Sequence, residues 1–314
     1  LFIFVTSMSP LEKRTISALA LIYALRMFGL FMVLPVLALY GSQYQGATAT
    51  LVGIAIGAYG LTQAMLQLPF GAWSDRIGRK PVILVGLILF SLGSALAAMA
   101  DNIWMLILGR ALQGAGAVAS TLMALMTDLT REENRTKAMA SIGASIGLSF
   151  TLAMVAGPVL AAWLGLSGLF VLTAILSLGA IVLLYTAVPT PTQQVRSRDA
   201  RAFFHQLIDV MADRQILRIS YGIFALHAVL VGTFVAVPVA LFQSGMAQAE
   251  HWKVYLPVMI SAFIVMVPFI IVAEKYKKMK PVLMLAVALL VASVACLALG
   301  IDNLTGLIMA LWLF

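Results

Sequence analysis

The sequence predicts an all-α polytopic membrane protein, and three observations support this fold class. Hydrophobic residues make up 62% of the 314 positions and charged residues only 10%, with a mean hydropathy of +1.05. Apolar stretches long enough to cross a bilayer recur along the chain, and Lys and Arg gather in alternate loops between them. A water-soluble domain has about 25% charged residues, so the composition indicates a lipid bilayer as the solvent.

Ten apolar stretches approach or reach the roughly 20 residues that a membrane helix needs. They cover residues 16–39, 51–73, 81–99, 103–126, 138–163, 169–188, 219–242, 254–273, 281–300 and 304–314. The tenth stops after 11 positions, and the chain opens on Leu1 with its first methionine at Met8. We therefore expect a sequence truncated in transmembrane helix 10, with residues 1–6 as an upstream extension.

The distribution of Lys and Arg predicts the orientation of the chain. Of 20 cationic residues, 17 fall in loops on one side, Lys253 falls on the other, and Arg26 and Arg110 lie inside helices. By the positive-inside rule, this bias places the N-terminus in the cytoplasm. The net charge of +8 is then a consequence of topology, and we expect no nucleic-acid partner.

A polar stretch at 189–218 divides the chain after the sixth apolar stretch. It opens with Pro189 and Pro191 before it turns basic, which is typical of a linker between domains. Five apolar residues within it recur at helical spacing, namely Phe203, Phe204, Leu207, Ile208 and Met211. They predict an amphipathic helix on the inner membrane surface, with an irregular loop as the alternative. The expected domains are a six-helix half at 1–188, the cytoplasmic linker at 189–218, and an incomplete half with helices 7–10 at 219–314.

The two sides of this linker resemble each other at an offset near 200 residues. Matching segments are 24–26 with 225–227, 35–36 with 238–239, 69–70 with 268–269, 75–76 with 274–275, 80–82 with 280–282, and 101–102 with 302–303. Ordered matches at loop positions are improbable by chance. The repeat predicts a 6+6 design of two pseudo-symmetric halves, which is a transporter architecture.

The loop at 71–81 is the most informative segment of the sequence. Between two apolar runs it holds Gly71, Asp75, Arg76, Gly78, Arg79 and Lys80. The glycines permit close approach and a tight reversal, and Asp75 can bind N–H groups at a helix end, its own or one from the other half. Asp128, after the fourth stretch, is a candidate ion-pair partner for the loop cations. The alternative is that these charges only set topology.

Four polar residues inside helices are candidates for proton coupling or substrate handling. Arg110 costs roughly 2.5 kcal/mol or more in a membrane, so it should face the interior, with Gln113 on the same helix face; bonding to carbonyls of helix 1 or 5 is the structural alternative. Arg26 lies closer to a helix end, where it could snorkel. His227 occupies the repeat position of Arg26, and imidazole titrates near neutral pH.

No Asp or Glu lies inside the first nine stretches, because all 12 acids map to loops or helix ends. Proton coupling would therefore use His227 or an acid in the missing helices, or else the protein is not proton-driven. The single cysteine, Cys296, permits no internal disulfide and indicates no metal site. Paired acids, a His cluster, a Gly-rich nucleotide loop and metal-ligand spacing are all lacking, which argues against a membrane-bound enzyme or sensor.

These motifs resemble the major facilitator superfamily, in particular its drug/proton antiporter branch. The loop at 71–81 is similar to the signature between helices 2 and 3, and residues 107–117 are similar to the helix 4 motif. Gly147 with Gly157 and Pro158 resembles the helix 5 antiporter motif, although alanines stand at 161 and 162 where that motif continues with glycines.

The resemblance implies a secondary active transporter of the bacterial inner membrane that works by alternating access. The expected activity is proton-coupled efflux of a lipophilic or amphiphilic small molecule, with an importer or uniporter of a small metabolite as the alternative. The loop at 71–81 would be a conformational latch between the halves, and Arg110 would serve proton coupling or substrate handling. The expected partners are a small-molecule substrate, protons and lipid. We expect a monomer without cofactor, and a truncated chain that cannot complete the transport cycle.

Overall fold

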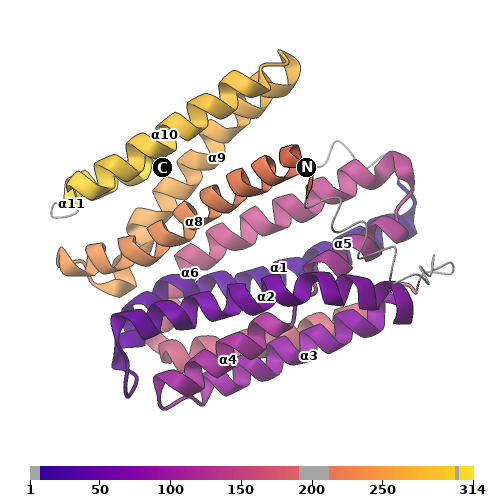
Figure 1. Ribbon diagram of the computed structural model, residues 1–314, viewed down its shortest axis with the longest axis horizontal. Helices are drawn as coiled ribbons and strands as arrows, with labels where there is room; N and C mark the ends of the chain where they lie inside the picture. Colours follow the sequence, from indigo (N-terminus) through magenta and orange to yellow (C-terminus); the bar gives the residue numbers. More distant parts are fainter. Residues whose placement is uncertain (1–7, 191–211, 301–303) are drawn as a thin grey trace.

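The computed structural model describes residues 8–190, 212–300 and 304–314, and within these ranges the fold is helical with no strand. The helices are α1 (Pro10–Tyr40), α2 (Ala49–Ile77), α3 (Arg79–Ala98), α4 (Ile103–Ala115), α5 (Ala119–Asp128), α6 (Glu132–Thr186), α8 (Arg214–Gln243), α9 (Trp252–Lys275), α10 (Met279–Gly300) and α11 (Leu304–Leu313). Two short 3-10 turns, η2 (Gly41–Gln43) and η3 (Gln248–Glu250), follow α1 and α8. Figure 1 shows α1 to α6 as one bundle and α8 to α11 as a second group beside it.

Three predicted spans have a different form in the structure. The stretch at 103–126 is split into α4 and α5 around Gly116, which has a non-helical ψ of 50°. The stretches at 138–163 and 169–188 form the single 55-residue α6, which would be about 80 Å long if straight. Gly165 interrupts it at φ 67°, ψ 178°, a backbone conformation that favours glycine.

Contacts at the two ends of α6 show that the chain turns back at Gly165. Near its start, Asn134 donates to the carboxylate of Glu12 at 3.5 Å. At its end, the carbonyl of Thr186 accepts from the guanidinium of Arg14 at 2.7 Å. Because both ends of α6 meet the first turn of α1, the two segments cross the bundle in opposite directions and supply the predicted fifth and sixth spans.

The first helix forms the centre of the N-terminal bundle. Its start is fixed by a capping box in which the hydroxyl of Ser9 accepts from the Glu12 N–H at 3.1 Å and the Glu12 carboxylate accepts from the Ser9 N–H at 2.9 Å. Apolar side chains on several faces of α1 are fully buried, including Ile22, Met32 and Val36. The helix packs against α2, α5, α6 and α8, although one side stays open, since Leu21 is 46% exposed.

The two groups of helices meet along α1 with α8 and along α6 with α9. Three rings from three helices stack edge to face at this boundary: Phe31 and Phe150 have centroids 4.9 Å apart, and Phe150 and Phe234 have centroids 5.0 Å apart. We call these three residues the aromatic bridge. The buried residues of α8 all lie between Thr233 and Leu241, in the half of the helix remote from the 189–218 linker.

The predicted repeat is visible in the placement of prolines. Pro35 lies inside α1 and Pro238 inside α8, each five residues before the end of its helix. Pro69 and Pro268 likewise lie inside α2 and α9. The predicted surface helix at 203–211, the match at 302–303 and the side chain of Glu274 fall outside the described residues.

Candidate functional site

The loop at 71–81 reverses the chain between α2 and α3 without an intervening coil. Gly78 has φ 105° and ψ 153°, which a residue with a Cβ adopts only with strain, and its N–H donates to the Ser74 carbonyl at 3.1 Å. Gly71 lies inside α2, and a Cβ there would be 3.6 Å from the Ser120 hydroxyl, an ordinary contact. Gly78 therefore makes the tight reversal, while the expected close approach at Gly71 is not found among the described residues.

Arg79 is the centre of the charged contacts in this loop. Its guanidinium donates to the Ser74 hydroxyl at 2.7 Å and to the Asp128 carboxylate at 3.1 Å, and it forms an ion pair with Asp75. These bonds connect α2, α3 and α5. Arg76 is exposed, and its side chain has no ion pair in the part of the chain that the structure describes.

Lys80 does not take part in the Arg79 contacts and binds the end of α6. Its ammonium donates to the Val188 carbonyl at 2.5 Å and lies 5.7 Å from the centroid of the Tyr185 ring. Arg14 donates to the Thr186 carbonyl nearby. Carbonyls at a helix C-terminus lack helical partners and attract cations, so these two residues hold the end of α6 where the linker begins.

We expect Arg79→Gln to lower the stability of the protein by about 1 kcal/mol, because it removes charge-assisted bonds that are partly exposed to solvent. Thermal unfolding in detergent will measure the change. Arg76→Gln, which removes an equal charge three residues away, is the matched control and should leave the midpoint unchanged. Equal shifts for both variants would mean that net charge, and not the Arg79 contacts, determines the stability.

The second copy of this loop lacks the glycines but keeps part of the geometry. Lys277, between α9 and α10, has φ 54° and so shares a positive φ with Gly78 of the first copy. A non-glycine residue pays roughly 1–2 kcal/mol for this conformation. The first copy is therefore the less strained of the two reversals.

Arg110 is buried in the N-terminal bundle, with 2% of its surface exposed. Its guanidinium donates to the Gln113 side-chain oxygen at 2.5 Å and to the Ala55 carbonyl at 3.4 Å, and lies 4.9 Å from the centroid of the Tyr59 ring. Gln113 in turn donates to the Ser94 hydroxyl at 2.8 Å. The backbone acceptor comes from α2, and not from helix 1 or 5 as the structural alternative supposed.

Arg26 does not snorkel toward a membrane surface, and that expectation was wrong. Only 1% of its surface is exposed, and at the chain break around Gly116 the Gly116 carbonyl accepts from one guanidinium nitrogen of Arg26 at 3.1 Å as well as from the Val118 N–H at 2.9 Å. The same nitrogen donates to the Tyr59 hydroxyl at 3.0 Å, and the guanidinium lies 5.3 Å from the centroid of the Phe90 ring. The other two nitrogens of Arg26 have no hydrogen-bond partner in the described structure.

Arg26, Tyr59, Arg110 and Gln113 thus form one assembly, which we call the cationic cluster. Within the described ranges, neither guanidinium has a carboxylate partner. Arginine stays protonated in proteins, so the cluster holds fixed positive charge and is not itself a proton carrier. Sequence reasoning missed Tyr59, the residue that contacts both arginines.

The remaining predicted residues lie on α6 and α8. His227 is exposed on α8, with its Nδ1 2.9 Å from the Ile223 carbonyl, although its repeat partner Arg26 is buried. A Cβ on Gly157 would lie 2.8 Å from the Met32 carbonyl, so glycine at 157, followed by the buried Pro158, permits close packing of α6 on α1. A Cβ on Gly147 would lie 3.6 Å from the Phe263 ring of α9.

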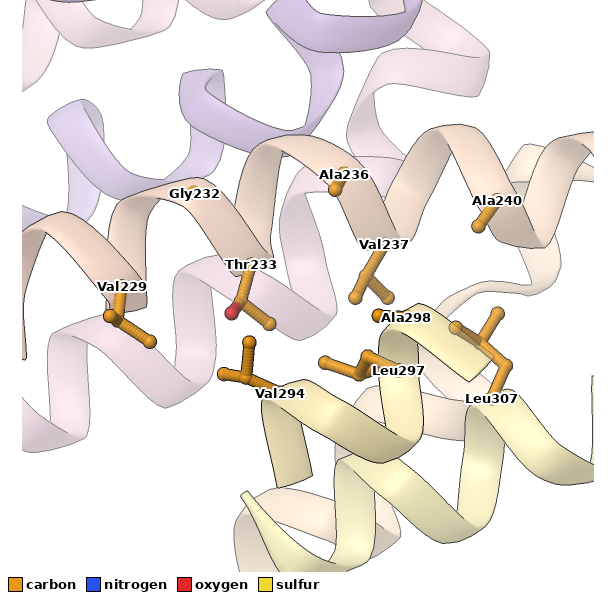
Figure 2. Close-up of a pocket in the computed structure, with 10 residues that line it drawn as sticks. All are labelled: Val229, Gly232, Thr233, Ala236, Val237, Ala240, Val294, Leu297, Ala298 and Leu307. Carbon is orange, nitrogen blue, oxygen red and sulfur yellow. The ribbon is translucent and has the colours of Figure 1, made fainter. Parts of the chain in front are cut away.

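An apolar pocket of about 330 Å³ lies between α8, α10 and α11 (Figure 2). Its lining residues are Val229, Gly232, Thr233, Ala236, Val237, Ala240, Val294, Leu297, Ala298 and Leu307. Thr233 supplies the single polar side chain among these ten. The walls therefore offer an apolar surface with almost no hydrogen-bonding groups.

Comparisons with known proteins all relate this chain to membrane transporters. The Major Facilitator Superfamily profile matches residues 19–314. Inner membrane transport protein YajR of Escherichia coli (strain K12) is 51% identical over 286 residues, which are 91% of this chain and 63% of YajR. Tetracycline resistance protein, class E, of Escherichia coli is 34% identical over 156 residues, which are 49% of this chain and 38% of that protein.

A solved structure supports the same fold. A bacterial homologue of the human lysosomal transporter Spinster, in an inward-facing and unoccupied conformation, matches with a TM-score of 0.75 at 18% identity over 98% of this chain and 72% of that chain. The chain described here is therefore shorter than its relatives and spans 63% of the length of YajR. It belongs to the Major Facilitator Superfamily, a family of multi-pass membrane transporters and not of enzymes.

Proposed function

We propose that the protein is a secondary active transporter that expels a lipophilic or amphiphilic small molecule in exchange for protons. Residues 1–188 and 219–314 belong to two halves joined by the linker at 189–218, and transport proceeds by rocking of one half against the other. The similarity to a tetracycline resistance protein supports efflux. In this proposal the protein is a monomer in the bacterial inner membrane, and its N-terminus lies in the cytoplasm.

The observation that carries this proposal is the uneven contact between the halves. The aromatic bridge joins α1, α6 and α8 at one end of the helices. At the other end, the bonds of Arg79 and Lys80 stay within the N-terminal bundle. The buried residues of α8 lie between Thr233 and Leu241, and those of α9 between Val254 and Val258. Burial on the second half is therefore concentrated toward the end that carries η3, and an uneven contact of this kind suits alternating access.

The loop at 71–81 is then proposed to be the latch that closes the separated end. The side chain of Asp75 is 36% exposed although it pairs with Arg79, so an additional donor can reach it. A helix N-terminus of the second half would be attracted to this carboxylate by its partial positive charge. Asp128 holds Arg79 from the other side and would keep Asp75 in position.

Proteoliposomes that contain the full-length protein and are loaded with an amphiphilic fluorescent dye will test the proposal. With the outside more acidic than the inside, protons flow in as dye leaves. Under this gradient we expect dye efflux, and a protonophore should reduce it to the rate of protein-free vesicles. Efflux that persists without the gradient would contradict proton coupling. Gradient-driven uptake of a small metabolite, without dye efflux, would favour the importer or uniporter and reject the exporter.

A further inference from the structure

A group of buried polar atoms without hydrogen bonds lies where the second half meets the first. His251 and Tyr255 are each 1% exposed, and both ring nitrogens of His251 and the hydroxyl of Tyr255 lack partners, as does the buried side-chain nitrogen of Gln248. The carbonyl of Met246 interacts electrostatically with the His251 ring without making a hydrogen bond of normal geometry. Buried polar groups are nearly always bonded in proteins, so these atoms need an explanation.

This group is attached to the aromatic bridge. The His251 and Tyr255 ring centroids are 6.2 Å apart, and those of Tyr255 and Phe234 are 6.3 Å apart. The backbone carbonyl of His251 accepts from the N–H groups of Val254 and Tyr255 at the start of α9, and the adjacent η3 packs against α6 and α8. His251 therefore lies at the end where the two halves are in contact.

The proton is the ligand that matches this site. Each unbonded atom has essentially no accessible surface, so an ion or small molecule has no space beside it, whereas a proton adds no volume. A neutral imidazole already has one donor and one acceptor nitrogen, and uptake of a proton makes both nitrogens donors. A buried imidazolium without an acceptor is unfavourable and gains water when the surface around it opens.

The charged groups near His251 do not offset the positive charge that a protonated ring would carry. Glu250 and Lys253 are roughly half exposed and pair with each other. The segments of α6 and α8 at this end contain no ionisable side chain. All the ionisable side chains of these two helices lie in other turns. They are Glu132, Glu133, Arg135, Lys137 and Tyr185 in α6 and Arg214, Arg218, Tyr221 and His227 in α8. On α10, Lys280 and Cys296 are both exposed, and the described part of α11 has no ionisable residue.

We propose that His251 is a proton-binding site that controls contact between the halves at this end. With a neutral ring the end stays closed, as in the described structure, and protonation favours separation of η3 and the first turns of α9 from α6. Because the proposed topology puts this end outside the cell, an external proton would favour opening to the outside. This inference rests on the proposed function for its direction of coupling.

Histidine titration and hydrogen exchange in lipid nanodiscs will test the site without substrate or gradient. With 13C-labelled histidine, the resonance that disappears in His251→Gln should titrate as the pH is lowered. Exchange at residues 246–258, corrected for the intrinsic effect of pH, should accelerate by up to about tenfold per pH unit as the pH falls toward the midpoint, and should level off below it. His251→Phe, which preserves the ring packing, should abolish this acceleration.

Glu250→Gln is the matched control, because it removes the nearest carboxylate and should leave the pH dependence intact. A His251 resonance that does not titrate, or acceleration that survives in His251→Phe, would overturn the inference. So would loss of the acceleration in Glu250→Gln. If the titration and the acceleration both occur but the protein proves not to be proton-driven, His251 is still a proton site and the transport proposal alone fails.

Discussion

In the full-length protein, transport by Arg110→Met should fall about 100-fold while the melting temperature changes by only a few degrees. A 100-fold loss corresponds to about 2.7 kcal/mol, which is within the range for charged hydrogen bonds that are made in a buried environment. A large loss of transport with little loss of stability distinguishes a functional arginine from a structural one. Dye efflux from proteoliposomes and thermal unfolding of the same preparation will measure them.

The small expected change in stability follows from the contacts of the guanidinium. Arg110 gains bonds to Gln113 and the Ala55 carbonyl and a position over the Tyr59 ring. It also places a second positive charge beside Arg26 with no carboxylate partner in the described residues. Removing a buried charge of this kind often stabilises a protein, which offsets the roughly 1–3 kcal/mol cost of leaving the Gln113 oxygen unbonded.

Arg110→Lys is the informative companion variant. It keeps the charge but loses the planar guanidinium that reaches Gln113 and Ala55 together, so transport should stay low if directed bonding matters and recover if charge alone matters. A fall of more than 10 °C in the melting temperature of Arg110→Met, with transport lost only in proportion to unfolded protein, would assign Arg110 to the structural role.

Hydropathy predicted the positions of the membrane spans because a helix in lipid must be apolar over its full length. The break around Gly116 was not predicted, since both sides of it are apolar and the pattern continues across it. That break supplies the carbonyl that binds Arg26, so the burial of Arg26 was missed for the same reason. Depth in the membrane can be estimated along a sequence, but the partner on a neighbouring helix cannot.

The glycines illustrate the same limit. Gly53 and Gly57 have the small-xxx-small spacing of packing motifs, yet a Cβ on either would meet nothing within 4 Å in the described structure. Gly93 and Ala97 have the same spacing, but there a Cβ on Gly93 would lie 2.2 Å from the Gln113 backbone nitrogen. Composition and spacing show that a helix has a face of small residues. Tertiary contacts determine whether another helix packs against that face.

The largest effect on stability is expected for Gly114→Ala, which should cost about 3 kcal/mol or prevent folding. A Cβ at this position would lie 2.1 Å from the Tyr59 carbonyl and 2.2 Å from the Thr62 hydroxyl. The carbonyl is backbone and cannot rotate away, and the Thr62 hydroxyl is fixed by its bond to the Ala111 carbonyl at 2.8 Å. The methyl group can therefore be accommodated only if α2 and α4 move apart.

Gly57→Ala is the matched control because it makes the same change on α2 in open space. Alanine is favoured over glycine in a helix by about 1 kcal/mol, so this variant should be as stable as the parent or slightly more so. Thermal unfolding and the yield of monodisperse protein in detergent will compare the two variants. A Gly114→Ala protein that melts with the parent would show that α2 and α4 separate easily. In that case the cationic cluster, which those helices hold together through Tyr59 and Arg110, would not be a rigid feature of the N-terminal half.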